Sequence, residues 1–290
     1  MKVTDIINSK RNTLSFEIFP PKTKDNYEVV EQSAQGIAAL HPDFMSVTYG
    51  AGGGTDVYTL SIAEDLYKRW NIPTIAHLSC ISSSHEDIDK KLDIIRERGI
   101  DNILALRGDK PAGFTGNLEY KYASDLVSEI KDKGNFCVGG ACYPEGHPES
   151  SSFLEDIDNL KRKVDAGCDF LTSQMFFENS AFYSFLSILR GRGIHVPVVA
   201  GVMPVTNANQ IKRIISLSGA ALPIRFKRIV DRYGDNPEAM KQAGIIYATE
   251  QIIDLYANGV SSVHVYSMNK TDVAAAIQRN LPKDVSVFCN

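Results

Sequence analysis

Short apolar segments of strand length alternate with longer segments of helical periodicity along almost the whole chain. This alternation restricts the fold more than any other feature, because strand–helix repeats of this kind build a parallel sheet. We predict eight strands, at residues 14–19, 44–48, 74–78, 103–106, 136–141, 170–172, 196–200 and 262–265. Eight such repeats predict an α/β fold of the (β/α)8 TIM barrel type, with a doubly wound open sheet as the alternative.

The intervening segments have the periodicity of helices, and several are followed by a glycine of the kind that caps a helix. We predict helices near residues 25–40, 56–69, 85–98, 122–132, 153–166, 179–191, 207–217, 237–258 and 271–280. The one enlarged connection, 219–244, is expected to add a short helix. No linker, repeat or low-complexity segment divides the sequence, so we expect residues 1–290 to form a single domain.

Polar residues recur at the carboxyl ends of the predicted strands, in the register that alternation assigns to one face. These residues are Ser46, Thr48, His77, Arg107, Asp109, Tyr143, Thr172, Gln174, His264 and Tyr266. The carboxyl ends of barrel strands meet at one mouth, where active sites of this fold occur. A ring of polar strand ends is difficult to explain by packing, and therefore predicts a binding site at this mouth.

Glu17 lies near the end of the first predicted strand, between Phe16 and Ile18 and before Pro20 and Pro21. Alternation places it on the face opposite to its two apolar neighbours. Burying an ionised carboxylate is costly unless the group is paired or its pKa shifts. Glu17 is therefore either a functional acid or a structural residue, in an ion pair across the interior or exposed at an edge.

Composition excludes several classes of protein. The net charge of −4 argues against nucleic acid as the main partner. No apolar run is long enough to span a bilayer, and residues 1–10 lack the apolar core of a signal peptide. Five cysteines, an odd number without a C-x-x-C pair, favour reduced thiols, and we expect a cytoplasmic protein.

Three motifs are ambiguous when taken alone. The glycine-rich loop 50–55 fits a phosphate site or a plain turn, and it does not fit the dinucleotide fingerprint. Arg107 and Asp109 fit either a ligand clamp or a surface ion pair. The loop 143–149 carries Glu145 and His147, but the spacing matches no metal motif, and we predict no metal.

Taken together, these stretches resemble the methylenetetrahydrofolate reductase family, over residues 14 to about 280 and in the family's order. The resemblance is carried by Ser15-Phe16-Glu17 with Pro20-Pro21, Val47-Thr48-Tyr49-Gly50-Ala51, His77-Leu78-Ser79-Cys80, Leu106-Arg107-Gly108-Asp109, Tyr122-Ala123-Ser124-Asp125-Leu126, Tyr143-Pro144-Glu145, His147-Pro148-Glu149, Asn159-Leu160-Lys161-Arg162-Lys163, Gln174, Phe176-Phe177, Met203-Pro204 and Asn207.

The resemblance implies reduction of 5,10-methylenetetrahydrofolate to 5-methyltetrahydrofolate by a hydride from reduced FAD. Glu17 matches the general acid that helps to open the substrate to a 5-iminium cation. Asp109 matches the aspartate near flavin and pterin, whose charge favours that cation. Positions matching FAD contacts are Thr48, His77, Arg107, Gly108, Asp109, Tyr122, Ala123, Tyr143, His147, Asp156, Asn159 and Lys163. Positions matching substrate contacts are Glu17, Asp109, Gln174, Gln210, Tyr266, Met268 and Lys270, the last standing where an arginine is common.

The resemblance leaves the electron source open among NADH, NADPH and a partner subunit, and it implies a homo-oligomer. Two other interpretations remain. One is a different FAD barrel, such as a proline-dehydrogenase-like enzyme, which binds flavin but ignores folate. The other is a folate- or flavin-binding subunit that needs a partner for turnover.

Overall fold

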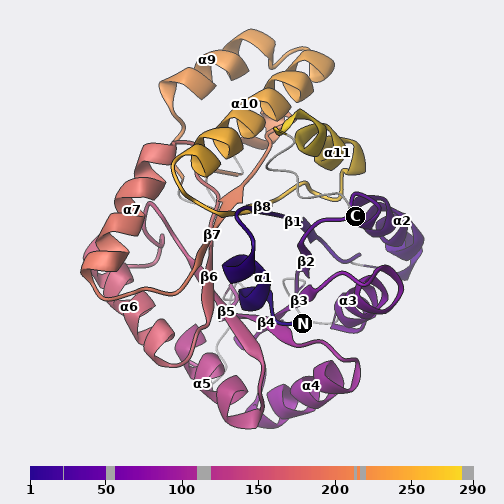
Figure 1. Ribbon diagram of the computed structural model, residues 1–290, viewed down its shortest axis with the longest axis vertical. Coiled ribbons are helices and arrows are strands. Elements are labelled where there is room, and N and C mark those ends of the chain that lie inside the picture. Colours follow the sequence, from indigo (N-terminus) through magenta and orange to yellow (C-terminus); the bar gives the residue numbers. More distant parts are fainter. Residues whose placement is uncertain (22, 50–55, 110–118, 212–213, 216–219, 283–290) are drawn as a thin grey trace.

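The chain forms a closed barrel of eight parallel strands surrounded by helices (Figure 1). The computed structural model describes residues 1–21, 23–49, 56–109, 119–211, 214–215 and 220–282. The strands are β1 (Thr13–Ile18), β2 (Phe44–Val47), β3 (Thr74–Ser79), β4 (Asn102–Leu106), β5 (Cys137–Cys142), β6 (Phe170–Ser173), β7 (Val198–Val202) and β8 (Ser262–Val265). Each strand pairs with the next in sequence, and β8 pairs with β1, so the prediction of a (β/α)8 barrel is confirmed.

The helices lie outside the strands and cover the barrel wall. They are α2 (Tyr27–Ala38), α3 (Asp56–Trp70), α4 (His85–Glu97), α5 (Ala123–Lys133), α6 (Phe153–Asp165), α7 (Asn179–Gly191), α9 (Ile224–Tyr233), α10 (Pro237–Ala257) and α11 (Thr271–Asn280), with short 3-10 turns η1 (Lys24–Asn26) and η2 (Ala208–Gln210). The short helix expected within 219–244 is α9. The helix predicted at 207–217 begins as the 3-10 turn η2. Its positions 212–213 and 216–217 lie outside the described residues.

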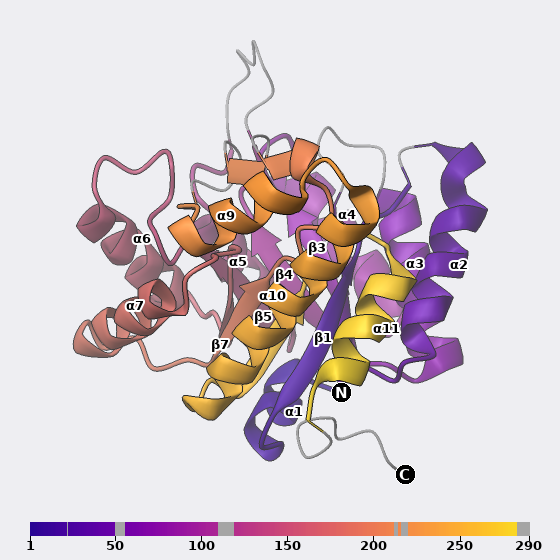
Figure 2. The same cartoon turned by 90° about the horizontal axis from the view of Figure 1, so that it is seen from above.

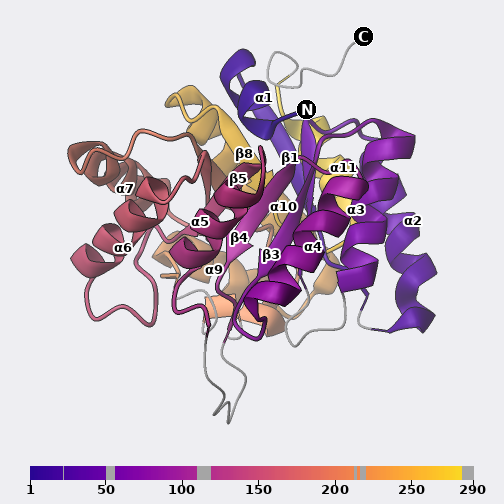
Figure 3. The same ribbon diagram turned by 90° about the horizontal axis from the view of Figure 1, so that it is seen from below.

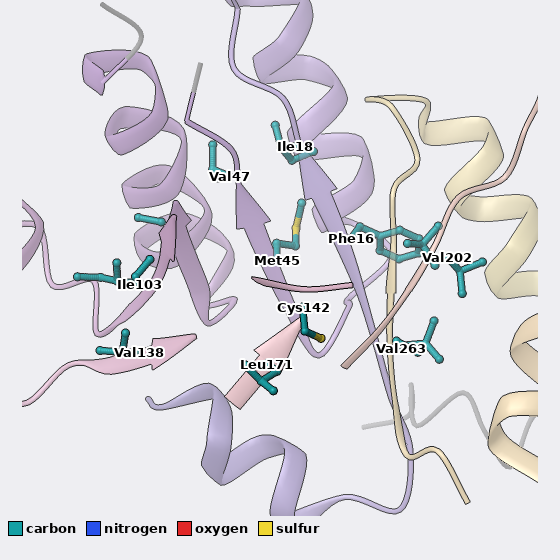
Figure 4. Packing of buried hydrophobic residues seen from close by; sticks show 14 of the residues in the cluster. Phe16, Ile18, Met45, Val47, Ile103, Val138, Cys142, Leu171, Val202 and Val263 are labelled. Atoms are coloured by element: carbon teal, nitrogen blue, oxygen red, sulfur yellow. The ribbon is translucent and has the colours of Figure 1, made fainter. Parts of the chain in front are cut away.

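Alternation along the strands separates two apolar layers. Phe16, Ile18, Met45 and Val263 point outward and pack under the helices, as Figure 4 shows for part of this cluster. The opposite face points into the barrel, where Phe44 and other side chains fill the interior near the beginnings of the strands. Alternation placed Glu17 on the face opposite to Phe16 and Ile18, and in the closed barrel that face points inward.

A helix that the sequence did not predict, α1 (Val3–Ser9), closes the end of the barrel where the strands begin (Figures 2 and 3). Val3 and Ile7 pack against the inward-facing residues of the strands. The buried Asn102 amide fixes this helix, because its oxygen accepts from Val3 N at 2.8 Å and its nitrogen donates to the Met1 carbonyl at 3.1 Å. With this end filled, the opposite end is left for a site.

The predicted seventh strand, 196–200, begins too early. In the structure β7 starts at Val198 and continues through Gly201 to Val202. Pro197 has no N–H to donate to a ladder, and only its carbonyl participates, accepting from Leu171 N at 2.8 Å. Because β7 begins and ends two residues later than predicted, Gly201 lies in the barrel wall.

Candidate active site

Glu17 is buried inside the barrel at the carboxyl end of β1, with 6% of its surface exposed. Its Oε2 lies 3.7 Å from Nε2 of His77, which points inward from β3. Burial raises the pKa of Glu17 to about 8 and lowers the pKa of His77 to about 3. At neutral pH the two groups are therefore a neutral acid beside a neutral imidazole, not an ion pair.

A second buried histidine lies beneath this pair. His264 on β8 contacts Ser15 Oγ through Nδ1 at 2.7 Å and Ser46 Oγ through Nε2 at 2.9 Å. The ring of Tyr266 stands nearly perpendicular to it, with centroids 5.5 Å apart. These contacts join strands β1, β2 and β8 directly below the acid.

A groove leads outward from the mouth over β4, β5, α5 and α6. It consists of two adjoining cavities of about 250 and 420 Å³, which share Arg107, Ala123, His147 and Lys163 in their walls. The inner cavity is also lined by Tyr49, Ser79, Ile81, Ser82, Gly108, Asp109 and Tyr143. The outer cavity is also lined by Tyr122, Ser124, Asp125, Glu149, Ser150, Glu155, Asp156, Asn159 and Arg162.

Arg107 stands at the junction of the two cavities. Its guanidinium makes a bidentate ion pair with Glu149, at 2.7 and 2.8 Å. The Arg107–Asp109 surface pair considered from the sequence is thus replaced by an Arg107–Glu149 pair. Gly108, between Arg107 and Asp109 in the sequence, has φ +88°. A Cβ at this position would lie 2.2 Å from Ser79 Oγ, so only glycine fits this turn.

Lys163 is half-buried although it belongs to a basic run on α6. Its stem crosses β5 at Gly140, where a Cβ would lie 2.7 Å from the lysine Cδ. Its ammonium donates to the Ala141 carbonyl at 2.6 Å, and burial lowers its pKa. This lysine is directed at the groove by the missing side chain of Gly140, and is not a solvated surface charge.

The β5–α6 loop forms the wall next to this lysine. Asp156 accepts a hydrogen bond from His147 N at 3.0 Å, which fixes the loop on the first turn of α6. The rings of Tyr143 and His147 meet edge to face, with centroids 4.5 Å apart. Glu145, in the same loop, accepts from Ala221 N at 3.1 Å and thereby ties this wall to the segment that precedes α9.

The opposite side of the mouth is built by β6, β7 and β8. Tyr266 donates to the Ser173 carbonyl at 2.6 Å, and a Cβ at Gly201 would lie 2.6 Å from the Tyr266 hydroxyl oxygen. Lys270 donates to Thr206 Oγ1 at 2.7 Å. Met268 has φ +56° and 43% of its surface exposed.

The groove has the chemistry of a site for a nucleotide cofactor with phosphate groups. Lys163 and Arg107, the latter paired with Glu149, supply positive charge. Helix α5 begins at Ala123 in the groove wall, and the dipole of a helix favours anions at its N-terminus. Asp109 and Asp156 supply acceptors for hydroxyl groups. Over the described ranges, no group of three or more His, Cys, Asp or Glu side chains is placed to hold a metal ion.

Residues 2–282 match the protein family described as methylenetetrahydrofolate reductase. The chain belongs to the methylenetetrahydrofolate reductase family. It is 35% identical over 271 residues to 5,10-methylenetetrahydrofolate reductase of Pectobacterium carotovorum subsp. carotovorum, covering 93% of this chain and 90% of that one. It is 36% identical over 300 residues to methylenetetrahydrofolate reductase (NADH) 1 of Arabidopsis thaliana, covering 97% of this chain but 51% of the relative, so it spans about half of the plant protein.

Solved structures agree at the level of the fold. An uncharacterised protein from Clostridium thermocellum that binds two copies of 5-methyl-5,6,7,8-tetrahydrofolic acid superposes with a TM-score of 0.63 and 15% identity, covering 94% of this chain and 96% of that one. Dihydropteroate synthase from Xanthomonas albilineans in complex with 7,8-dihydropteroate gives a TM-score of 0.53 and 14% identity, covering 94% of this chain and 95% of that one. No helix of the described segments combines the length and the hydropathy needed to cross a bilayer.

The structure gathers most of the cofactor positions expected for this family in the groove. Those that line it are Arg107, Gly108, Asp109, Tyr122, Ala123, Tyr143, His147, Asp156, Asn159 and Lys163. Thr48, which follows β2, and His77, which faces Glu17, are absent from the lining of these two cavities.

The expected substrate positions are spread around the mouth. Glu17 lies inside the barrel, and Gln174 follows β6, where its Oε1 accepts from Met175 N at 2.9 Å. Tyr266, Met268 and Lys270 follow β8 in the chain. The backbone of Gln210 belongs to η2, and its side chain lies outside the described residues.

Sequence reasoning missed two features of the site. Ser46 and His264 were recognised only as polar strand ends, and their contact was not foreseen. Ser79 was not chosen as a lining residue, although it follows His77 by two positions and shares its inward face.

Proposed function

We propose that this protein reduces 5,10-methylenetetrahydrofolate to 5-methyltetrahydrofolate, with FAD held in the groove. The observation that carries the proposal is the buried neutral acid of Glu17 at the mouth, next to a groove with the charges that FAD requires. Bound FAD supplies the hydride that reaches the methylene carbon. The protein's own side chains carry out the remaining steps.

Glu17 donates its proton to N10 of the folate, which opens the bridge between N5 and N10 and leaves a cation at N5. A carboxyl group whose pKa is about 8 is protonated at neutral pH and is still acidic enough to transfer its proton. His77 then stands 3.7 Å from the carboxylate that is formed. Asp109, in the wall of the inner cavity, stabilises the substrate cation with its negative charge.

The binding roles follow from position and charge. Arg107 and Lys163 hold the phosphate groups of FAD, with the N-terminus of α5, and Asp156 and Asn159 hold hydroxyl groups. The β8 side of the mouth, with Gln174, Tyr266, Met268 and Lys270, holds the folate. We further propose a nicotinamide donor. NADH is the first to test, because plant relatives carry it in their names, and a partner subunit is the alternative electron source.

The decisive experiment is an anaerobic visible spectrum of the FAD-loaded protein after addition of 5-methyltetrahydrofolate without nicotinamide. Bleaching of the oxidised flavin bands is expected, because the folate returns its hydride by the reverse reaction. A yellow protein that keeps its colour would refute the proposal, and would favour another flavin barrel or a subunit that needs a partner. Failure to take up FAD would refute the assignment of the groove.

The same protein also distinguishes the electron sources. NADH and NADPH are added separately under anaerobic conditions, and the rate of flavin bleaching is compared. Reduction by neither nucleotide, together with bleaching by the folate, would assign electron supply to a partner protein. We also expect a homo-oligomer, which sedimentation velocity tests directly.

A further inference from the structure

Only one placement of hydrogens makes every contact of His264 and Ser15 a hydrogen bond. The ring is 2% exposed, and burial lowers its pKa to about 3, so it is neutral and carries one N–H. Ser15 Oγ donates to the Val263 carbonyl at 3.0 Å. A hydroxyl has a single hydrogen, so the same oxygen accepts from Nδ1–H of His264 at 2.7 Å.

This arrangement determines what Ser46 does. With its hydrogen on Nδ1, the His264 ring presents a lone pair at Nε2. Ser46 Oγ, 2.9 Å from Nε2, must therefore be the donor. The single hydroxyl hydrogen of Ser46 is directed at His264 and is unavailable to any other acceptor.

Ser46 is also the direct neighbour of Glu17 across the β1–β2 ladder. Within the described segments, the Glu17 carboxyl accepts no hydrogen bond of standard length. The titratable groups that interact with it are His77 on β3, at 3.7 Å, and Tyr266, which directly follows β8. Tyr266 donates elsewhere, to the Ser173 carbonyl. Hydrogen bonds from donors favour a charged carboxylate, so a carboxyl without such donors keeps its proton.

We propose that His264 is a positioning residue, which binds the hydroxyl hydrogen of Ser46 and so withholds it from Glu17. His264 does not contact the substrate in this role. It acts on the acid through Ser46, one strand away. The proposal rests on the proposed function, in which protonated Glu17 is the form that reacts.

Two substitutions of His264 separate the two hydrogen bonds. In His264→Asn the side-chain amide reaches the position of Nδ1, so the contact with Ser15 is kept and the contact with Ser46 is lost. In His264→Gln the amide oxygen reaches the position of Nε2, and it accepts from Ser46 as the ring does. Ser46→Ala removes the hydroxyl itself and is the matched control.

The measurement is the anaerobic oxidation of FAD-loaded, reduced protein by 5,10-methylenetetrahydrofolate, followed by stopped flow from pH 6 to 9.5. The alkaline midpoint is the pH at which this rate falls to half, and it reports the ionisation of Glu17. We expect His264→Asn to lower the midpoint by at least about half a pH unit, because the freed Ser46 hydroxyl donates to the carboxylate. His264→Gln and Ser46→Ala should keep the wild-type midpoint, and the double variant His264→Asn/Ser46→Ala should regain it.

Several outcomes would overturn the proposal. A purely structural role predicts slower oxidation in both His264 variants, with no change of midpoint. A midpoint that rises in Ser46→Ala would show that Ser46 already donates to Glu17 in the wild type, and this test needs no substitution of His264. A wild-type protein that is not oxidised by the folate at any pH would remove the proposed function itself, and the role of His264 with it.

Discussion

Replacing Glu17 with glutamine should change the pH dependence of folding stability in a calculable way. In the folded wild type this carboxyl keeps its proton up to about pH 8, whereas in the unfolded chain it ionises near its ordinary pKa of 4.5. Between these values the folded state binds one proton more than the unfolded state. Wild-type stability therefore falls as the pH rises through this window, and no such loss from this group occurs below it.

The size of the effect follows from linkage. One proton difference gives a slope of about 1.4 kcal/mol per pH unit. The glutamine side chain is an uncharged isostere of the protonated acid, so the Glu17→Gln variant lacks this term. The free energy of unfolding of Glu17→Gln minus that of the wild type should grow by roughly 2.7 kcal/mol between pH 5.5 and 7.5. His77 stays neutral throughout, because burial lowers its pKa to about 3.

The assay is urea unfolding of both proteins at half-unit pH intervals, followed by circular dichroism. The matched control is Glu97→Gln, which changes an exposed carboxyl on α4. For that pair the difference in unfolding free energy should be flat with pH. A flat difference for Glu17→Gln as well would show that Glu17 is ionised in the folded protein, which would remove the basis of its role as an acid.

Three further substitutions test other parts of the structure. Gly201→Ala puts a Cβ against both the Ser173 carbonyl oxygen, its nearest atom, and the Tyr266 hydroxyl oxygen at 2.6 Å. It should weaken folate binding at least tenfold in a fluorescence titration while FAD stays bound, and unchanged affinity would contradict the close contacts. Asn102→Ala removes the amide that anchors α1 and should lower the free energy of unfolding by about 2–4 kcal/mol, while folate reduction at 20 °C is retained. A loss below about 1 kcal/mol would argue against anchoring of α1 by this amide. Lys163→Met should release FAD, as measured by ultrafiltration. The control Lys161→Met, on the same helix, should retain it. Equal retention of FAD by both variants would refute the phosphate role of Lys163.

The barrel and the inward face of its strands were predictable because both depend on local patterns. Alternation along β1 placed Glu17 on the face opposite to Phe16 and Ile18, and the repeated strand–helix order required parallel pairing. Helix α1 was not predicted, because seven residues are too few for a periodicity to stand out. Its anchor, Asn102, is distant in sequence, and the contact exists only after the barrel has formed.

The site was predictable where it depends on strand ends and unpredictable where it depends on pairing between side chains. A basic run such as 161–163 indicates an exposed helix face. The missing side chain of Gly140, over twenty residues earlier, is what admits Lys163 to the groove. Similarly, the sequence places Arg107 at the mouth but does not reveal that Glu149 binds it.

Closure of the barrel by the β1–β8 pair has a consequence for the acid. The contact between Ser15 and His264 joins residues separated by 249 positions, and the walls around Glu17 come from β1, β2, β3 and β8. No contiguous fragment that omits either end of the barrel contains this pocket. In such a fragment Glu17 would face water and ionise as an ordinary carboxylate. The proton on Glu17 is thus a property of the closed ring of strands, and refolding near neutral pH should draw one proton per chain from the solvent.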